Sequence, residues 1–227
     1  METVVFELTQ PHGLIERYVD SLYALKFQRR TGWGDETSEE SVAAHSYSVM
    51  ALARALIPDS NEDKLRVLEL LRFHDLGEAI VSDIPKFEKR YIDEQNEERV
   101  VNRIALLGAL TQSSDMLAMR DAFMTFESES DSEAVRIAQD FDRLELLIQF
   151  HRFKRAGRKI SNEVEFEKYV QPARFSTSLG KDFASRFQTY FSQSTHLTSD
   201  LEMQFWGEGV AHRGIGRGGL LAAELPG

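Results

Sequence analysis

The stretch Phe73-His74-Asp75-Leu76-Gly77-Glu78 brings one imidazole and two carboxylates into six residues. The apolar residues around it recur at helical spacing, which predicts one helix from about Asp63 to about Val81. On a helix, His74 and Asp75 diverge by about 100°, yet both can reach one ion placed beside the helix. Glu78 follows one turn later on the same side, close enough to act on a water molecule next to such an ion.

One helix cannot surround an ion, so further ligands are expected from neighbouring helices. His45 lies in the preceding helical segment, which Ser41 is expected to cap, and Asp142 lies in a later one. Two imidazoles and two carboxylates form a site for a borderline divalent ion, such as Mn, Co, Ni, Fe or Zn. Taken singly, each residue has an ordinary interpretation as a packed or surface side chain, so the prediction rests on their combination.

Helical spacing extends over most of the chain, and the sequence contains no convincing set of alternating strands and no internal repeat. We therefore predict an all-α protein with one domain over residues 10–195. Residues 207–227 hold seven of the 14 glycines. We predict a flexible, disordered tail there, because such a segment buries too little apolar surface to order itself. The other helices are expected at about 14–25, 42–56, 87–110, 115–126, 133–153 and 179–191.

The composition is that of a globular protein, with 42% hydrophobic and 28% charged residues among 227. The absence of cysteine excludes disulfides and thiolate chemistry. No apolar run reaches about 18 residues and no secretory signal pattern is present, so we expect no membrane span and a cytoplasmic location. The net charge of −10 disfavours long nucleic acids as partners, although local basic clusters can bind small anions. Two such clusters exist, each with an ordinary interpretation as a solvated surface: Lys26, Arg29 and Arg30, and Lys86, Lys89 and Arg90.

The order of a histidine, a His-Asp pair and a distant aspartate resembles the HD-domain superfamily. Three motifs narrow this resemblance to the HD-domain 5′-deoxynucleotidases, an all-α helical-bundle family. The resemblance covers roughly Leu14 to Phe153. The motifs are Arg30-Thr31-Gly32-Trp33, Glu40-Ser41-Val42-Ala43-Ala44-His45-Ser46, and His74-Asp75-Leu76-Gly77-Glu78 continuing into Ser82-Asp83-Ile84-Pro85.

The resemblance implies a role for each matching position. Glu78 and Asp83 match the acid/base and water-positioning carboxylates of the family. Arg30 matches the arginine that meets the substrate phosphate, and Trp33 lies beside it, either lining the pocket or packing at a turn. One departure is Ala44, where the family usually has an acid, and the loss of that support would lower metal affinity. The positions that match the metal ligands are His45, His74, Asp75 and Asp142.

The expected activity is therefore removal of the 5′-phosphate from deoxyribonucleoside 5′-monophosphates by a hydrolase with one divalent ion. Two-metal HD enzymes generally use extra histidines between the His-Asp pair and the last aspartate, and residues 76–141 contain none. His151, nine residues past Asp142, would point to the opposite side of a helix. Two alternatives stay open, namely hydrolysis of another small phosphate ester and a non-catalytic HD module that senses a nucleotide. The resemblance also makes a homodimer possible.

Overall fold

The computed structural model describes residues 12–31, 33, 40–79, 81, 83–110, 114–128, 131–155 and 157–193. By its internal contacts the chain divides into two compact units, residues 1–186 and 187–227. The first unit contains every residue of the candidate site. Of the second unit, only residues 187–193, the end of the last helix, are described. The predicted tail at 207–227 lies outside the described residues, and the predicted domain boundaries at 10 and 195 remain a prediction.

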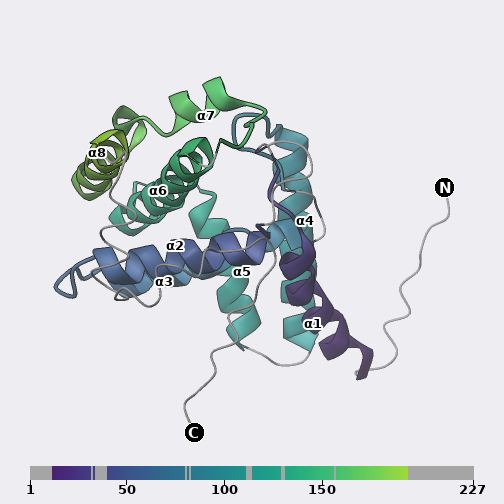
Figure 1. Ribbon diagram of the computed structural model, residues 1–227. Helices are drawn as coiled ribbons and strands as arrows, with labels where there is room; N and C mark the ends of the chain where they lie inside the picture. The colour runs from purple at the N-terminus through teal and green to yellow at the C-terminus, as the bar shows by residue number, and fades with distance from the viewer. Residues whose placement is uncertain are drawn as a thin grey trace, which may run out of the picture. The chain divides into compact units, whose positions relative to one another are not determined.

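The described residues form an all-α fold, as the sequence predicts (Figure 1). None of the described helices combines the length and the apolar character that a membrane crossing requires. Eight α-helices and two 3₁₀ turns follow one another in these residues: α1 (His12–Phe27), α2 (Val42–Leu56), α3 (Lys64–Phe73), η1 (Leu76–Ala79), α4 (Tyr91–Leu110), α5 (Ser114–Phe126), α6 (Glu133–Arg155), α7 (Glu163–Tyr169), η2 (Pro172–Arg174) and α8 (Ser178–Gln193).

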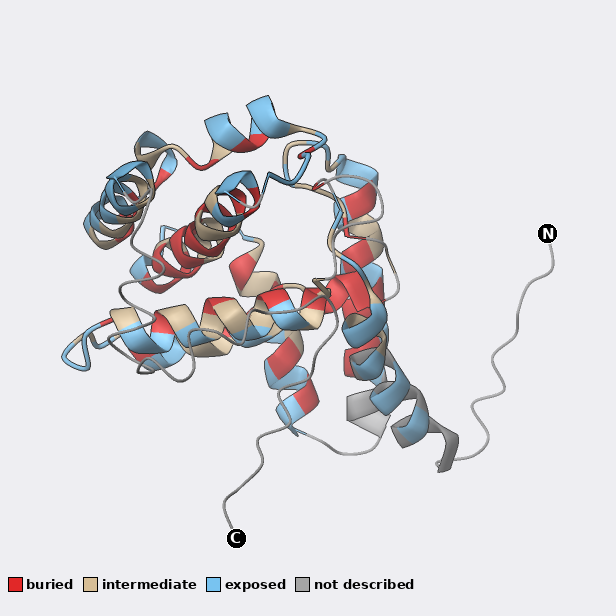
Figure 2. Cartoon of the chain, viewed as in Figure 1, coloured by how far each residue is buried: buried red, intermediate tan, exposed pale blue. Residues whose placement is uncertain are grey.

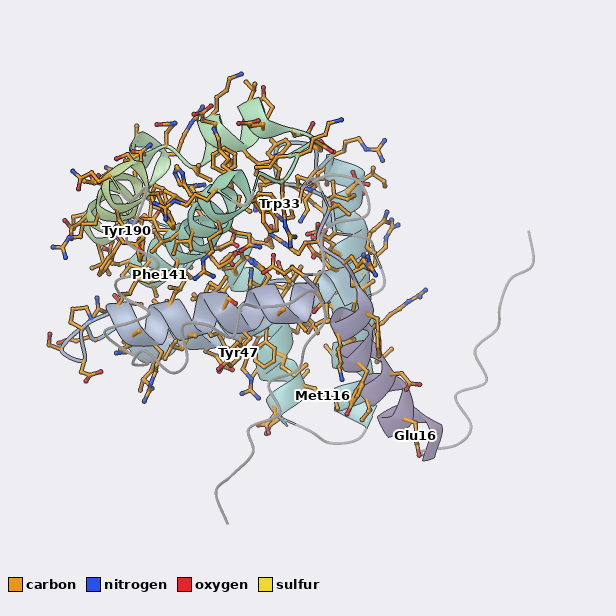
Figure 3. All side chains as sticks on the ribbon, viewed as in Figure 1. Glu16, Trp33, Tyr47, Met116, Phe141 and Tyr190 are labelled. Carbon is orange, nitrogen blue, oxygen red and sulfur yellow. The ribbon has the colours of Figure 1, made fainter. Side chains whose placement is uncertain are left out.

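The main core lies where α2, α3 and α6 pack against one another (Figure 2). Phe141 of α6 is fully buried there, whereas Tyr47 of α2 is 70% exposed (Figure 3). Apolar residues at helical spacing thus line the inner faces of the three helices, and burial of those faces stabilises them. The largest fully buried side chains include Leu70, Leu71, Leu144, Leu147 and Phe150.

A second apolar cluster joins η1 to α4 and α5, which also pack against each other. Leu76 of η1 lies in this cluster together with Val101 and Ile104 of α4 and Phe123 of α5. Because Leu76 stands between Asp75 and Glu78 in the sequence, its burial fixes the backbone that carries both carboxylates. The cluster therefore positions the motif that the sequence singles out.

The prediction of one helix from about Asp63 to about Val81 is wrong in its second half. α3 ends at Phe73, a turn follows, and residues 76–79 form a 3₁₀ helix. Apolar spacing does not separate these conformations, and a tertiary contact at Gly77 accompanies the 3₁₀ turn. A Cβ atom at Gly77 would lie 2.6 Å from the Cβ of Glu97, so only glycine lets η1 approach α4 this closely.

Other helix boundaries follow from capping groups. Ser41 caps α2 as predicted, because its hydroxyl accepts from the backbone N–H of Ala44. The helix expected from about Phe87 begins instead at Tyr91. Asp93 reaches back to the N–H of Arg90, which satisfies a free donor at the start of α4. α7 and η2 were not predicted from the sequence.

A short antiparallel bridge between Arg29 and Ser41 closes the segment that connects α1 to α2. The N–H of Arg30 donates to the carbonyl of Glu40 at 3.1 Å, and the N–H of Val42 donates to the carbonyl of Gln28 at 2.9 Å. The backbone of Arg30 is therefore fixed beside the start of the helix that carries His45.

The segment before α8 is attached to α6 by a buried carboxylate. Asp140 accepts hydrogen bonds from the N–H of Ser176 at 2.8 Å and from the N–H and hydroxyl of Thr177, each at 2.7 Å. Thr177 in turn accepts from the N–H of Gly180 and so caps α8. A Cβ at Gly180 would lie 2.3 Å from an oxygen of Asp140, so a glycine is required at this contact.

Candidate metal centre and pocket

Three potential ligand atoms converge from different parts of the first unit. His45 on α2, His74 directly after α3, and Asp142 on α6 each place a ring nitrogen or carboxylate oxygen within 4.8 Å of the others. Asp142 Oδ1 lies 3.0 Å from His45 Nε2 and 3.7 Å from His74 Nε2. The histidines are buried and the aspartate is partly buried. This set has the composition and spacing of a site for a divalent cation.

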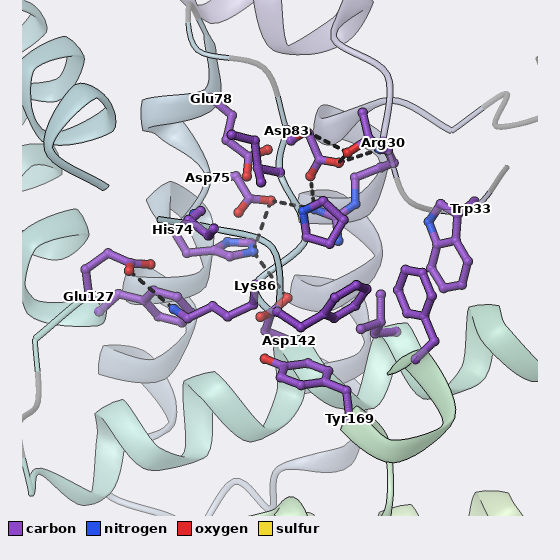
Figure 4. A pocket seen from close by; sticks show the side chains of 18 residues that line it. Arg30, Trp33, His74, Asp75, Glu78, Asp83, Lys86, Glu127, Asp142 and Tyr169 are labelled. Atoms are coloured by element: carbon purple, nitrogen blue, oxygen red, sulfur yellow. Dashed lines mark hydrogen bonds and ion pairs between the residues drawn. The ribbon is translucent and has the colours of Figure 1, made fainter. Parts of the chain in front are cut away.

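Asp75 adds a fourth atom from the turn after α3. Its Oδ2 lies 3.2 Å from His74 Nε2 and 3.7 Å from His45 Nε2, as the dashed line to the His74 ring in Figure 4 illustrates. The four residues proposed from the sequence therefore gather in one place. The expectation that all four lie on helices is wrong for His74 and Asp75, because the α-helix has already ended there.

One hydrogen bond determines which ring nitrogen of His74 carries the proton and which is left as an acceptor toward the other ligands. His74 Nδ1 lies 2.7 Å from the carbonyl oxygen of Leu71, which can only accept, so this nitrogen carries the proton. In the neutral ring, Nε2 then directs a lone pair toward Asp75 and Asp142. His74 Nε2 and Asp75 Oδ2 are both buried and have no hydrogen-bond partner among the described residues. Buried polar atoms of this kind are rare, and a cation between them satisfies both.

His45 has a carboxylate at each ring nitrogen. Nδ1 lies 2.7 Å from Glu145 Oε2, and Nε2 lies 3.0 Å from Asp142 Oδ1. A neutral imidazole can donate to only one of them, so a proton or a metal ion is needed on the other side. Burial and the charge of Arg30 lower the pKa of His45, but the hydrogen bonds to Asp142 and Glu145 outweigh them and raise it to about 10. The metal-free cluster thus holds a proton that a cation would replace.

Glu78 lies on η1 at the edge of this cluster and is 4% exposed. Its Oε2 is buried without a hydrogen-bond partner among the described residues. Burial, followed by the charges of Asp75 and Asp83, raises the pKa of Glu78 well above its ordinary value. A carboxyl group in this environment is suited to accepting and returning a proton near neutral pH.

Asp83 differs from Glu78, because hydrogen bonds occupy its carboxylate. Arg30 Nη1 donates to Asp83 Oδ1 at 2.8 Å, and the backbone N–H of Thr31 donates to Oδ2, which also lies 2.9 Å from the Thr31 hydroxyl. Burial lowers the pKa of Arg30, but the charges of Asp83 and Asp75 outweigh burial and raise this pKa above its ordinary value. The guanidinium therefore stays protonated. Asp75 Oδ2 lies 3.8 Å from the same Nη1 atom. Asp83 thus orients Arg30 beside the candidate metal site.

A pocket opens over these groups and is closed on other sides by residues from α5, α6 and α7 (Figure 4). Trp33 forms part of its wall, but it is only 2% exposed and stacks on Phe166 of α7 with 4.2 Å between ring centroids. It therefore lines the pocket and packs in an aromatic cluster at once. Lys86 and Glu127 form a 3.3 Å ion pair at another part of the wall, near Tyr169.

The basic clusters of the sequence divide between pocket and surface. Arg30, Lys86 and Lys89 line the pocket. Lys26 and Arg29 are exposed, and so is the side chain of Arg90, which pairs with Asp93. His151, expected to point away from the cluster, is not among the residues that converge there.

Glu145, which forms a hydrogen bond with His45, was not predicted from the sequence as a site residue. Glu145 follows Asp142 by three residues on α6, and this spacing places both on nearly the same face of a helix. That signal was available in the sequence. Ala44, where the resemblance leads one to expect an acid, is exposed on α2, so α6 supplies the carboxylate that orients His45. Tyr169 could not be foreseen, because α7 itself was not predicted.

The comparison with known families agrees with this arrangement, since residues 22–182 match the HD domain family. The chain belongs to the HD domain family. The helices that hold the converging residues all lie within the matched range, and the converging His-His-Asp set is therefore part of the HD domain itself.

Two similar proteins are 5′-deoxynucleotidases of yeasts. A 5′-deoxynucleotidase of Saccharomyces cerevisiae is 26% identical over 197 residues, which cover 83% of this chain and 82% of that protein. The 5′-deoxynucleotidase hdd1 of Schizosaccharomyces pombe is 30% identical over 158 residues, covering 67% of this chain and 77% of that protein. This HD domain protein is thus related to 5′-deoxynucleotidases over most of its length.

Solved structures share the fold. The structure of a predicted metal-dependent phosphohydrolase from Magnetospirillum magnetotacticum superimposes on this chain with a TM-score of 0.59 at 19% identity. The superposition covers 80% of this chain and 95% of that one. The HD domain-containing protein YGK1 gives the same TM-score at 16% identity and covers 82% of this chain. At these identities the likeness establishes the helical fold alone.

Proposed function

We propose that this HD domain protein is a metal-dependent phosphohydrolase that converts deoxyribonucleoside 5′-monophosphates to a nucleoside and inorganic phosphate. The relation to 5′-deoxynucleotidases supports the substrate class. The single observation that carries the proposal is the pair of unpartnered buried atoms, His74 Nε2 and Asp75 Oδ2, between His45 and Asp142. A bound cation explains why these two buried atoms, 3.2 Å apart, have no hydrogen-bond partner among the described residues.

His45, His74, Asp75 and Asp142 would hold one divalent ion, which is Mn, Co, Ni, Fe or Zn by the chemistry of its donors. When bound, such an ion supplies positive charge to a phosphoryl oxygen and lowers the pKa of water. Glu145 keeps the His45 ring oriented through its 2.7 Å hydrogen bond. The donors come from rigid helices and a buried turn, so the site is formed before substrate arrives.

Arg30 binds the phosphate in this proposal. Asp83 accepts from one of its nitrogens, and among the described residues no other acceptor takes the remaining guanidinium donors. These donors can form paired hydrogen bonds with a phosphate, a geometry that suits arginine better than lysine. Asp83 itself accepts bonds from both Arg30 and Thr31. Of the two carboxylates named from the sequence, Asp83 therefore fits the orientation of Arg30 better than proton transfer.

Glu78 is the group we assign to proton transfer. Its raised pKa and its unpartnered Oε2 let it take a proton from the attacking water and return it to the leaving 5′-oxygen. The nucleoside would then lie along the wall that holds Tyr169, beside the buried Trp33, where an aromatic ring and a hydroxyl can contact sugar and base.

The test is a substrate panel on the purified protein, with the metal content measured on the same sample. We expect hydrolysis of 5′-dNMPs in preference to 5′-NMPs, 3′-NMPs and sugar phosphates, and loss of both bound metal and turnover in Asp75→Ala. Turnover of a different ester alone would assign the protein to that substrate. Nucleotide binding without turnover in either protein would favour a sensor module. Light scattering of the same sample tests the possible homodimer.

A further inference from the structure

A buried ion pair lies beside the proposed site without a role in the mechanism above. Lys89, in the segment between η1 and α4, donates from Nζ to Glu97 Oε2 of α4 at 2.9 Å. The two side chains are 8% and 3% exposed. Lys89 also lines the pocket that contains Asp75, Glu78 and Arg30. A buried ion pair is therefore open on one side to the place where substrate would bind.

The pair is not well explained as a stabilising contact. Replacing a buried ion pair by apolar residues is often neutral or stabilising, because the cost of removing two charges from water offsets their attraction. The fold nevertheless accommodates this pair closely, since Gly77 of η1 packs against the Cβ of Glu97 with no room for a side chain. This contact brings the Lys89–Glu97 pair next to η1 and Glu78.

Lys89 has hydrogen-bonding capacity that the described residues do not use. An ammonium group carries three donors, and Glu97 is the one partner of Lys89 Nζ among the described residues. Burial opposes protonation, but the charge and hydrogen bond of Glu97 outweigh it and raise the pKa of Lys89. The group is thus a permanent cation, and two of its donors remain available to a ligand in the pocket.

Acids outnumber cations in the pocket wall, so an anionic ligand is expected to bind only beside the cations. Five acids line the pocket against three cations, and each cation is partly neutralised by one acid, Arg30 by Asp83, Lys86 by Glu127 and Lys89 by Glu97. A second cation beside Arg30 would offset more of the negative field that these acids present to a phosphate monoester dianion. Lysine acts as a point charge on phosphate oxygens and cannot bind a metal ion, because its ammonium has no lone pair. The five acids are Asp75, Glu78, Asp83, Glu127 and Asp142.

We propose that Lys89, held in place by Glu97, is a second phosphate-binding residue that acts together with Arg30 on the substrate phosphate. This inference rests on the proposed phosphohydrolase function. Lys89 adds a second cation to the phosphate-binding residues named from the motifs. Glu97 would orient the Lys89 side chain and leave two of its donors for a ligand in the pocket.

The experiment compares Lys89→Met with Lys64→Met as the matched control. Lys64 has a similarly covered side chain, 10% exposed, and is ion-paired with Asp59, but it does not line the pocket. We measure KM and kcat for the best ester of the panel, the inhibition constant of inorganic phosphate, and phosphate binding by calorimetry. In Lys89→Met, KM and the phosphate constants are expected to rise about 10- to 100-fold, the effect of one charged hydrogen bond. Lys64→Met keeps the wild-type constants per folded molecule.

Glu97→Gln separates phosphate binding from a structural role of the pair. The amide oxygen still accepts from Lys89, so this variant keeps wild-type phosphate affinity under the proposal, whereas a structural ion pair predicts equal losses in both variants. If Lys89→Met does not fold, Lys89→Gln replaces it under the same criteria. Unchanged phosphate constants in an active Lys89 variant overturn this inference alone. Absence of turnover and of phosphate binding in the wild-type protein overturns the proposed function instead.

Discussion

Asp140 and Asp142 stand two residues apart on α6 and have opposite environments. The Asp140 side chain is fully buried, and both of its oxygens accept hydrogen bonds from residues 176 and 177. The Asp142 side chain is 27% exposed and faces two imidazoles in a cluster where neighbouring buried atoms have no partner. Within one turn of α6, one carboxylate therefore joins two segments of the fold, whereas the other faces a cluster in which buried polar atoms lack hydrogen-bond partners among the described residues.

The difference separates polar groups that maintain the fold from those that await a ligand. Native proteins satisfy nearly all buried polar atoms, so a region that leaves several unpartnered is a place where another molecule or ion belongs. Burial does not distinguish the two regions, since both contain buried acids. The hydrogen bonds of the carboxylates do, since both oxygens of Asp140 have donors, whereas Asp75 Oδ2 and Glu78 Oε2 have none among the described residues. Substitutions in each region should therefore change different properties.

The largest effect is expected for Asp142→Ala, which removes one of the four proposed metal ligands. Turnover should fall by about 10³-fold or more, because the charge stabilisation that a bound ion provides is worth several kcal/mol. Urea unfolding of the metal-free protein should change less than in Asp140→Ala, since His45 keeps its bond to Glu145. Steady-state kinetics and metal analysis check the first part. Retained metal and turnover would exclude Asp142 as a ligand.

Asp140→Ala should show the reverse pattern. The N–H groups of Ser176 and Thr177 would lose their acceptors in a buried position, which costs about 3 kcal/mol or more in the free energy of unfolding. Metal content per folded molecule should stay unchanged. Chemical denaturation with metal analysis tests this, and Asp140→Asn, which keeps one acceptor oxygen, is the milder control. A stable Asp140→Ala protein would show that the α6 contact is dispensable.

Glu145→Gln sharpens the comparison on the ligand side. The amide removes the negative charge next to His45 Nδ1 while keeping the size of the side chain, and such supporting groups typically contribute about 10- to 100-fold in metal affinity. Competition with a chelator measures the loss. Equal affinity in variant and wild type would mean that the ring is oriented by packing alone.

The smallest expected effect is a dependence of metal affinity on pH. In the metal-free protein the pKa of His45 is raised to about 10, whereas a metal-bound imidazole nitrogen carries no proton. Binding therefore releases a proton below that pH, and affinity should rise with pH by up to about tenfold per unit. Chelator competition at two pH values on either side of neutrality tests the sign. Affinity that falls with rising pH would contradict the protonated His45.

Much of this arrangement was predictable from the sequence, because ligand chemistry restricts residue types. His45, His74, Asp75 and Asp142 were all named in advance, and the structure brings them together. The end of α3 was not predictable, since apolar spacing is the same for α-helix and 3₁₀ turn. The partners of Lys89 depend on how closely η1 approaches α4, and that distance is set by tertiary packing that no local pattern encodes.

The bridge between Arg29 and Ser41 has a consequence for how this protein can vary. Two backbone hydrogen bonds, Arg30 to Glu40 and Val42 to Gln28, fasten the ends of the connection between α1 and α2 irrespective of side-chain identity. The spacing from Arg30 to the helix of His45 is consequently independent of what lies between them. Insertions or deletions between the two ends of this connection are therefore expected to leave Arg30 beside the helix that carries His45.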